Sequence, residues 1–195
     1  HSVITDYNQI TISVLNNGGL TGVTIDSTGK LSIPAGTFEG TYSITYSICE
    51  KANPANCSSA TITIVVGRGL QITTTSVCRN DVPYLAYTIT PNFIPASANE
   101  VSITWLNGDG TSLNPPVVYT GLTQSGELLW PGAVLDNLGN PIDWPGWYTQ
   151  NGQWIQGPDG FEGTRPNSII KVTINPTDSV VASYPPATPM CNAAP

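Results

Sequence analysis

The chain has 195 residues, a length that suits one large domain or two small ones. Only 10% of its residues are charged, and Thr, Ser, Asn, Gly and Pro are abundant in their place, which favours an all-β protein with many short strands. The net charge of −7, with six Lys and Arg in all, excludes the basic face that nucleic acids require and disfavours binding to anionic membranes.

No apolar run approaches the length of a membrane span, and no signal peptide is evident. The only methionine is Met190, so we expect either a processed mature form or a fragment of a longer chain. The sequence leaves both alternatives open, and it does not decide whether His1 is native.

Residues 1–66 predict a small β module. Apolar residues alternate from Ile10 to Val14, residues 26–30 have the composition of a hairpin loop, and residues 36–66 predict two long strands with period-two alternation. The apolar faces of these long strands comprise Tyr42, Ile44, Tyr46 and Ile48 on the first and Ile62, Ile64 and Val66 on the second. About five strands are few for an immunoglobulin-like (Ig-like) sandwich, so we expect a minimal sandwich or one completed by a strand from elsewhere.

Cys49 and Cys57 bracket the polar loop between the two long strands. Cysteines at the facing ends of a hairpin are placed to form a disulfide across it, and alternation puts Cys49 on the face opposite Tyr46 and Ile48. Four cysteines without a Cys-x-x-Cys pair favour two disulfides over a zinc or redox site. Disulfides indicate an oxidising, extracellular setting.

The same block resembles a known repeat family. Residues 34–42, Pro-Ala-Gly-Thr-Phe-Glu-Gly-Thr-Tyr, lead into the strand Tyr46-Ser-Ile-Cys-Glu50. This pattern is similar to the closing half of Ig-like or cadherin-like tandem repeats in large cell-surface, adhesin-type proteins of Bacteroidetes, including flavobacteria. The resemblance covers residues 9–66 and implies an architectural part of a surface protein. It also implies secretion through the type IX system, whose sorting signal is not evident here.

After a short hinge at residues 67–69, a larger β-sandwich module is expected over residues 70–195. Its strand patterns lie at residues 84–90, 101–106, 116–120, 127–130, 153–155, 168–174 and 179–184. Cys78 and Cys191 lie near its two ends, and we predict that they pair and close a loop of more than a hundred residues. As a whole the module more weakly resembles C-terminal or capping modules of the same surface proteins.

Residues 129–163 predict a long, turn-rich insertion in this module. Four of the five tryptophans lie there, two of them in Trp-Pro-Gly motifs. Large aromatic rings can build a core for such a loop or can stack on sugar rings, and we favour packing. For the sugar-binding alternative the candidate contacts are Trp144, Trp147, Tyr148 and Trp154. Trp147 and Tyr148 are the pair expected at the surface in that case.

Motifs for catalysis are missing from the sequence. His1 is the only histidine, so neither a copper site built on two histidines nor a Ser-His-Asp device can form. A glycoside-hydrolysing pair is formally available among Asp136, Asp143, Asp159 and Glu162, but acidic residues in Asn- and Gly-rich segments typically cap turns. We therefore expect no enzyme activity.

Calcium is the one cofactor that the sequence leaves open. Short loops around Asp109, Asp136, Asp159 and Glu162 offer oxygen ligands next to glycines, although none matches an EF-hand. The same motifs are also common hairpin turns, and we favour turn chemistry.

These observations predict two Ig-like antiparallel β-sandwich domains, the second with a long Trp-, Gly- and Pro-rich insertion. The expected function is that of an extracellular structural or adhesive module, with neighbouring repeat modules or identical subunits as partners. One alternative is a filament subunit that exchanges a strand through the tail from His1 to Asn8. The other is a carbohydrate-binding module that recognises surface glycans through the Trp-rich loops.

Overall fold

A computed structural model of the chain describes residues 6–189. Almost all regular structure is antiparallel β, as predicted, and the only helical elements in that range are two short 3-10 turns, η1 (Tyr7–Gln9) and η2 (Glu162–Thr164). The chain divides into two compact units, His1–Gly69 (unit 1) and Leu70–Pro195 (unit 2). The division falls at the end of the expected 67–69 hinge.

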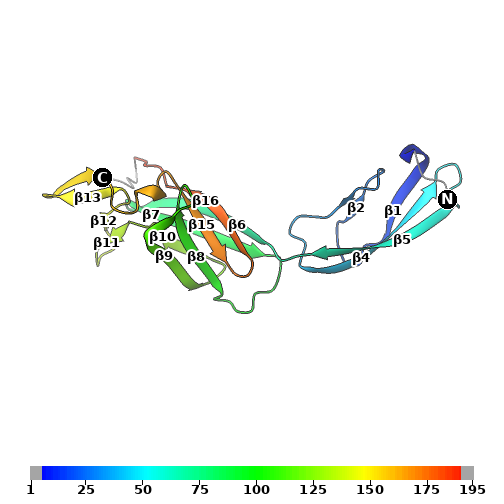
Figure 1. The fold of residues 1–195 in the computed structure, drawn as a ribbon, viewed down its shortest axis with the longest axis horizontal. Coiled ribbons are helices and arrows are strands. Elements are labelled where there is room, and N and C mark those ends of the chain that lie inside the picture. Colours follow the sequence, from blue (N-terminus) through cyan, green and yellow to red (C-terminus); the bar gives the residue numbers. More distant parts are fainter. Residues whose placement is uncertain (1–5, 190–195) are drawn as a thin grey trace. The chain divides into compact units, whose positions relative to one another are not determined.

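Unit 1 is built on one three-stranded sheet in the order β1-β4-β5 (Figure 1). Its strands are β1 (Ile10–Asn16), β4 (Gly40–Glu50) and β5 (Cys57–Val66), and a two-stranded ladder of β2 (Thr24–Ile25) and β3 (Leu31–Ser32) accompanies it. Leu20 and Val23 pack on Ile44 from the apolar face of the sheet, and these three residues form its buried core. Over residues 6–69, unit 1 thus has five strands, fewer than the seven of a full Ig sandwich.

The predicted hairpin disulfide is present. Strands β4 and β5 pair without a break from Gly40 and Val66 to Cys49 and Cys57, and the two cysteines form the Cys49–Cys57 bridge. The continuous register places Cys49 on the polar face, opposite the face that carries Ile48, as alternation predicted. The second predicted pair includes Cys191, which lies outside the described residues, so Cys78–Cys191 stays a prediction.

Unit 2 is a seven-stranded sandwich of two sheets. One sheet has the order β10-β7-β6, and the other has the order β16-β15-β8-β9. The strands are β6 (Leu70–Arg79), β7 (Val82–Pro91), β8 (Val101–Asn107), β9 (Ser112–Leu122), β10 (Ser125–Leu129), β15 (Asn167–Thr173) and β16 (Thr177–Ser183). The first, second and fifth of these strands form one sheet and the others form the second, an Ig-like arrangement with the fourth strand beside the third.

The two sheets of unit 2 bury one continuous core between them. Leu85 and Ile89 of β7 face Ile103 of β8 and Ile170 of β15, all less than 3% exposed. Trp105, at the centre of the third sandwich strand, is 1% exposed, and a buried tryptophan on that strand is typical of Ig-like domains. The core gives unit 2 a rigid base on which the insertion is mounted.

Four short strands lie in the insertion between β10 and β15. They pair as two separate hairpins, β11 (Val134–Leu135) with β12 (Pro141–Asp143) and β13 (Trp147–Gln150) with β14 (Gln153–Gln156). Among residues 6–189 no helix is long and apolar enough to cross a membrane.

Candidate functional site

The insertion of unit 2 is anchored in the sandwich core by Trp130. The Trp130 ring is fully buried and meets Trp105 and Tyr184 edge to face, at centroid distances of 4.9 and 5.2 Å. Its indole Nε1 donates to Thr164 Oγ1 at 3.0 Å, and Thr164 is itself fully buried. The two ends of the insertion are therefore joined through one buried hydrogen bond.

Both Trp-Pro-Gly motifs form tight turns. Ala133 N donates to Trp130 O, and Trp147 N donates to Trp144 O, each at 3.1 Å. Gly132 and Gly146 occupy the third turn position with φ of 88° and 79°, the left-handed conformation that a type II turn requires there. Each turn thus redirects the chain immediately after an anchoring tryptophan.

Trp144 is the second anchor. It is 7% exposed, and its Nε1 donates to Asp81 O at 2.7 Å, on the turn between β6 and β7. Trp154 lies edge to face against it at 5.1 Å. Trp144 is therefore a packing residue that contacts the β13–β14 hairpin through Trp154 and offers little surface to a ligand.

The β13–β14 hairpin carries the other three predicted contact residues. Its register pairs Tyr148 with Ile155 and Thr149 with Trp154, so Trp154 shares a face with Trp147 whereas Tyr148 lies on the opposite face. Tyr148 and Trp154 are exposed to 37% and 36%, and Trp147 is half-buried. The four candidate sugar contacts are thus divided between a buried anchor, Trp144, and the two opposite faces of the β13–β14 hairpin.

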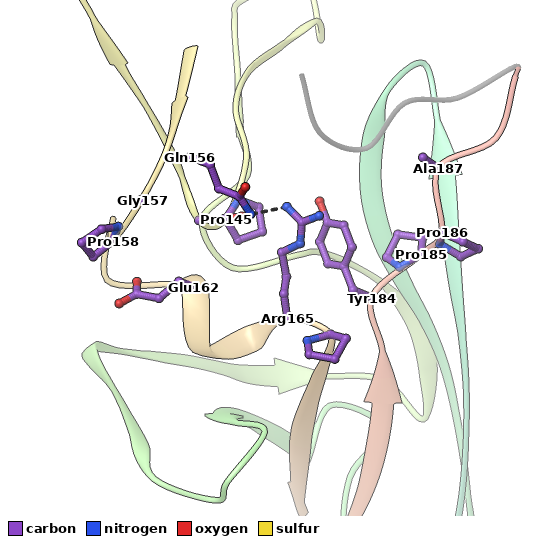
Figure 2. Close-up of a pocket in the computed structure, with 12 residues that line it drawn as sticks. Pro145, Gln156, Gly157, Pro158, Glu162, Arg165, Tyr184, Pro185, Pro186 and Ala187 are labelled. Carbon is purple, nitrogen blue, oxygen red and sulfur yellow. Dashed lines mark hydrogen bonds between the residues drawn. The ribbon is translucent and has the colours of Figure 1, made fainter.

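Tyr148 contacts a residue that lines a groove, which the sequence did not predict. A Cβ atom placed on Gly157 would lie 2.8 Å from Tyr148 Cε1, so the ring rests directly on the backbone of Gly157. Gly157 lines a hollow of about 630 Å³ (Figure 2). Its walls come from four segments: the turn before β13, the end of β14 and the residues after it, the η2 region, and the tail after β16. The lining residues are Pro145, Gly146, Gln156, Gly157, Pro158, Glu162, Arg165, Pro166, Tyr184, Pro185, Pro186 and Ala187.

Arg165 lies at the centre of this groove. Its guanidinium group stacks over the Tyr184 ring at 4.3 Å from the centroid, and Nη1 donates to Pro145 O at 3.1 Å (Figure 2). Burial raises the pKa of the Tyr184 hydroxyl far above its ordinary value, against the smaller opposing effect of the Arg165 charge, so Tyr184 stays neutral. Arg165 also lines a second hollow of about 510 Å³, together with Asn107 and Asp109 among others.

The groove combines the chemistry of a polar ligand site with that of an apolar one. Its pyrrolidine rings and the adjacent ring of Tyr148 present flat apolar surfaces. Arg165 has further guanidinium N–H groups besides the one that donates to Pro145 O. Such a set suits a ligand with an apolar ring face and hydroxyl or carboxylate oxygens.

The carboxylates near the groove accept hydrogen bonds from backbone N–H groups. Asp159 accepts hydrogen bonds from Gly146 N and Phe161 N, and Glu162 accepts one from Gly160 N at 2.8 Å. Backbone N–H groups, beginning with its own, lower the pKa of Glu162. Asp143 differs, because burial raises its pKa and the charge of Asp159 adds to the rise. Asp159 and Glu162 thus act as turn caps, which is what turn chemistry predicts.

The other predicted calcium ligands also cap turns, in loops of their own. Asp109 Oδ1 accepts from Thr111 N and Thr111 Oγ1 between β8 and β9, and Asp136 Oδ1 accepts from Leu138 N and Asn140 N between β11 and β12. Hydrogen bonds from these turn partners lower the pKa of both carboxyls. Over residues 6–189 no group of three or more His, Cys, Asp or Glu residues could hold a metal ion, and calcium at these loops stays a prediction.

Part of the predicted exchange tail lies outside the described residues. The remainder forms η1, in which Asp6 Oδ1 accepts from Asn8 N at 2.9 Å, and Lys51 Nζ donates to Asn8 O at 2.8 Å. Residues 6–9 are therefore curled into a capped turn against the end of β4.

Comparison with known proteins adds no relative. No protein-family model, no curated protein and no solved structure matches the chain.

Proposed function

We propose that the chain is an extracellular structural and adhesive module of a bacterial cell-surface protein and that it catalyses no reaction. The observation that carries the proposal is its construction from two separate β units, each with a core of its own and one closed by a hairpin disulfide. Discrete β modules in series are a common way to hold a binding surface away from its attachment point. The disulfide supports an oxidising location.

The sequence supports the same reading. A surface with few charges raises little electrostatic barrier to close contact with another module or with a neutral glycan, and residues 9–66 resemble tandem repeats of adhesin-type proteins. Among the carboxylates formally available for hydrolysis, Asp159 and Glu162 cap turns and Asp143 accepts a hydrogen bond from Trp144 N, contacts that give them a structural role.

The non-catalytic part of the proposal is tested by incubating the full chain with a panel of polysaccharides and measuring new reducing ends. We expect release no faster than from buffer alone. Turnover that disappears in Asp143→Ala or Glu162→Ala would overturn it, because a carboxylate whose role is only structural supports no reaction that its removal could abolish.

A second candidate function is carbohydrate binding, and the geometry at the groove favours it. Tyr148 is an exposed ring that rests on Gly157, one of the residues that line the groove, and the stacked pair of Arg165 and Tyr184 also lines it. Aromatic faces pack on the apolar faces of sugar rings, while arginine donates to hydroxyl or carboxylate oxygens. The preferred surface is thus the Tyr148 face of the hairpin and not the Trp147–Trp154 face.

Affinity electrophoresis in gels that contain soluble neutral or acidic polysaccharides tests this second function. We expect Tyr148→Ala and Arg165→Ala to lose retardation and Tyr7→Ala, which removes an even more exposed ring from unit 1, to keep it. Retardation that survives both groove changes would refute binding at this surface, and so would the absence of retardation by every polysaccharide. Arg165→Lys keeps the positive charge but removes the planar guanidinium group, so it shows whether retardation requires the paired N–H donors of arginine or only its charge.

A further inference from the structure

No strand of the described part of the chain covers the outer edge of β5 in unit 1. The strand is the last in the order β1-β4-β5, so a strand pairs with it on one side only within the described residues. Its ten residues pair with β4 in continuous register, without a bulge. An unpaired edge of this length presents a row of backbone donors and acceptors to any approaching chain.

The hairpin geometry identifies which residues point outward. Cys49 and Cys57 have Cα atoms 4.1 Å apart, the close spacing of a pair that exchanges no backbone hydrogen bonds. The next pair bonds across the strands, since Glu50 N donates to Asn56 O at 3.1 Å. Because bonded and non-bonded pairs alternate, the even-numbered residues of β5 bond to β4 and the odd-numbered ones direct their N–H and C=O groups away from it.

Hydrogen bonds between β4 and β1 confirm this assignment of odd- and even-numbered residues. Lys51 N donates to Gln9 O at 2.9 Å, and Thr11 Oγ1 donates to Cys49 O, so odd-numbered residues of β4 face β1. The residues of β5 that face the open side are therefore Cys57, Ser59, Thr61, Thr63 and Val65, all of which are exposed.

The features by which proteins usually protect an edge are missing from β5. The strand reads Cys-Ser-Ser-Ala-Thr-Ile-Thr-Ile-Val-Val, with neither a charged residue nor a proline. The opposite edge strand, β1, differs because its register is interrupted by an irregularity between Val14 and Asn16. The continuous edge of β5 is thus the better template for a further strand.

We propose that β5 pairs antiparallel with β5 of a second copy of this chain, which joins two three-stranded sheets into one of six strands. The proposal deepens the adhesive function by naming a partner, and it depends on unit 1 alone. A two-fold axis at Thr61 sets Thr63 opposite Ser59 of the other copy. Every facing pair then consists of two odd-numbered residues, whose N–H and C=O groups point toward the other strand. Each pair can exchange two backbone hydrogen bonds, roughly ten in all.

The second copy fits this edge for a chemical reason. Because β5 carries no charged residue, none of the facing pairs in this self-pairing sets like charges opposite each other. On the polar face the pairing brings Thr and Ser hydroxyls together, as Thr45 and Thr61 already meet at 3.2 Å. On the apolar face the pairing extends the row formed by Ile62 and Ile64 with the same two residues of the second copy.

Sedimentation equilibrium of the full chain over a wide concentration range tests the proposal. We expect the mass to rise from that of a 20.6 kDa monomer toward twice that value. Thr63→Lys places a charge on the edge, and Thr63→Pro removes an outward N–H group without breaking a bond to β4, so both should raise the dissociation constant at least about tenfold. Thr41→Lys places the same charge on the same polar face but on the middle strand, β4, and it should leave the dissociation constant unchanged.

Amide hydrogen exchange locates the interface. The N–H groups of Ser59, Thr61 and Thr63 should gain protection as concentration rises, whereas that of Ile62 is protected at every concentration. A chain that stays monomeric throughout overturns the proposal, and so does a dimer that forms without protection of the odd-numbered amides or persists in both Thr63 variants. Because the groove variants lie in unit 2, loss of glycan binding with dimerisation intact counts against the groove alone.

Discussion

Replacing Thr164 with valine tests how the insertion is held to the core. Valine keeps the shape of threonine, so the fully buried site remains filled, but Trp130 Nε1 loses the acceptor that lies 3.0 Å away. Phe161 O keeps a donor, since Thr164 N binds it at 2.9 Å. A buried N–H left without a partner costs about 1–3 kcal/mol, and we expect unit 2 to lose about 2 kcal/mol of unfolding free energy.

Denaturant unfolding followed by tryptophan fluorescence measures this loss in unit 2 alone, because all five tryptophans lie there. Trp130→Phe removes the N–H group, so Thr164→Val in that background should cost at least about 1 kcal/mol less than in the parent. Thr164→Ser keeps the hydroxyl and should lose only about 1 kcal/mol for its methyl group. Equal costs of Thr164→Val in the two backgrounds would refute the reasoning.

Three further predictions concern the disulfides and one turn. Changing Cys49 and Cys57 to serine should lower the stability of unit 1 by about 2–3 kcal/mol for a sequence separation of 8, visible in far-ultraviolet circular dichroism melts, and unchanged melting would contradict it. Mass spectrometry of a nonreduced digest should yield a peptide that links Cys78 to Cys191, and a link from Cys78 to unit 1 would contradict the pairing. Asp136→Ala should lower the denaturation midpoint above about pH 4, and its difference from the parent should fade as the pH falls below that value, because the stability that comes from a carboxyl with a depressed pKa is lost on protonation. A difference that stays constant with pH would exclude this role for the charge.

Period-two alternation made most of the sandwich predictable. Where one face of a strand is buried and apolar, as around Ile103 and Ile170, the pattern located the strand to within a few residues. The hairpin disulfide followed from the same alternation together with the facing positions of Cys49 and Cys57. Local pattern sufficed in these cases because the residues that pair are close in sequence or bury a full apolar face.

Strand β6 was missed for an opposite reason. Beyond Ile72 its inward positions are Thr74 and Ser76, which are half-buried, so the strand alternates in burial but hardly in hydrophobicity. Its place in the sandwich comes from pairing with β7 and from Ser76 Oγ, which donates to Ser183 O of β16. Tertiary contacts of this kind leave no periodic signal in the sequence.

The groove was beyond sequence reasoning because its parts are distant along the chain. Arg165 stacks on Tyr184, and Tyr148 rests on Gly157, contacts that depend on how the insertion folds back on the sandwich. The clustering of tryptophans did identify the region, but it could not separate anchors from exposed rings. Arg165 was the available signal, as one of only six basic residues and the one nearest the aromatic cluster in sequence.

Adhesion of beads that carry the full chain tests the central claim most directly. The beads are placed on surfaces coated with bacterial surface polysaccharide or with the same chain, and the shear force that detaches them is measured against albumin-coated beads. The account predicts higher detachment forces for the chain, reduced by Tyr148→Ala on the polysaccharide or by Thr63→Lys on the chain itself. Detachment forces equal to those of albumin on both surfaces would contradict it.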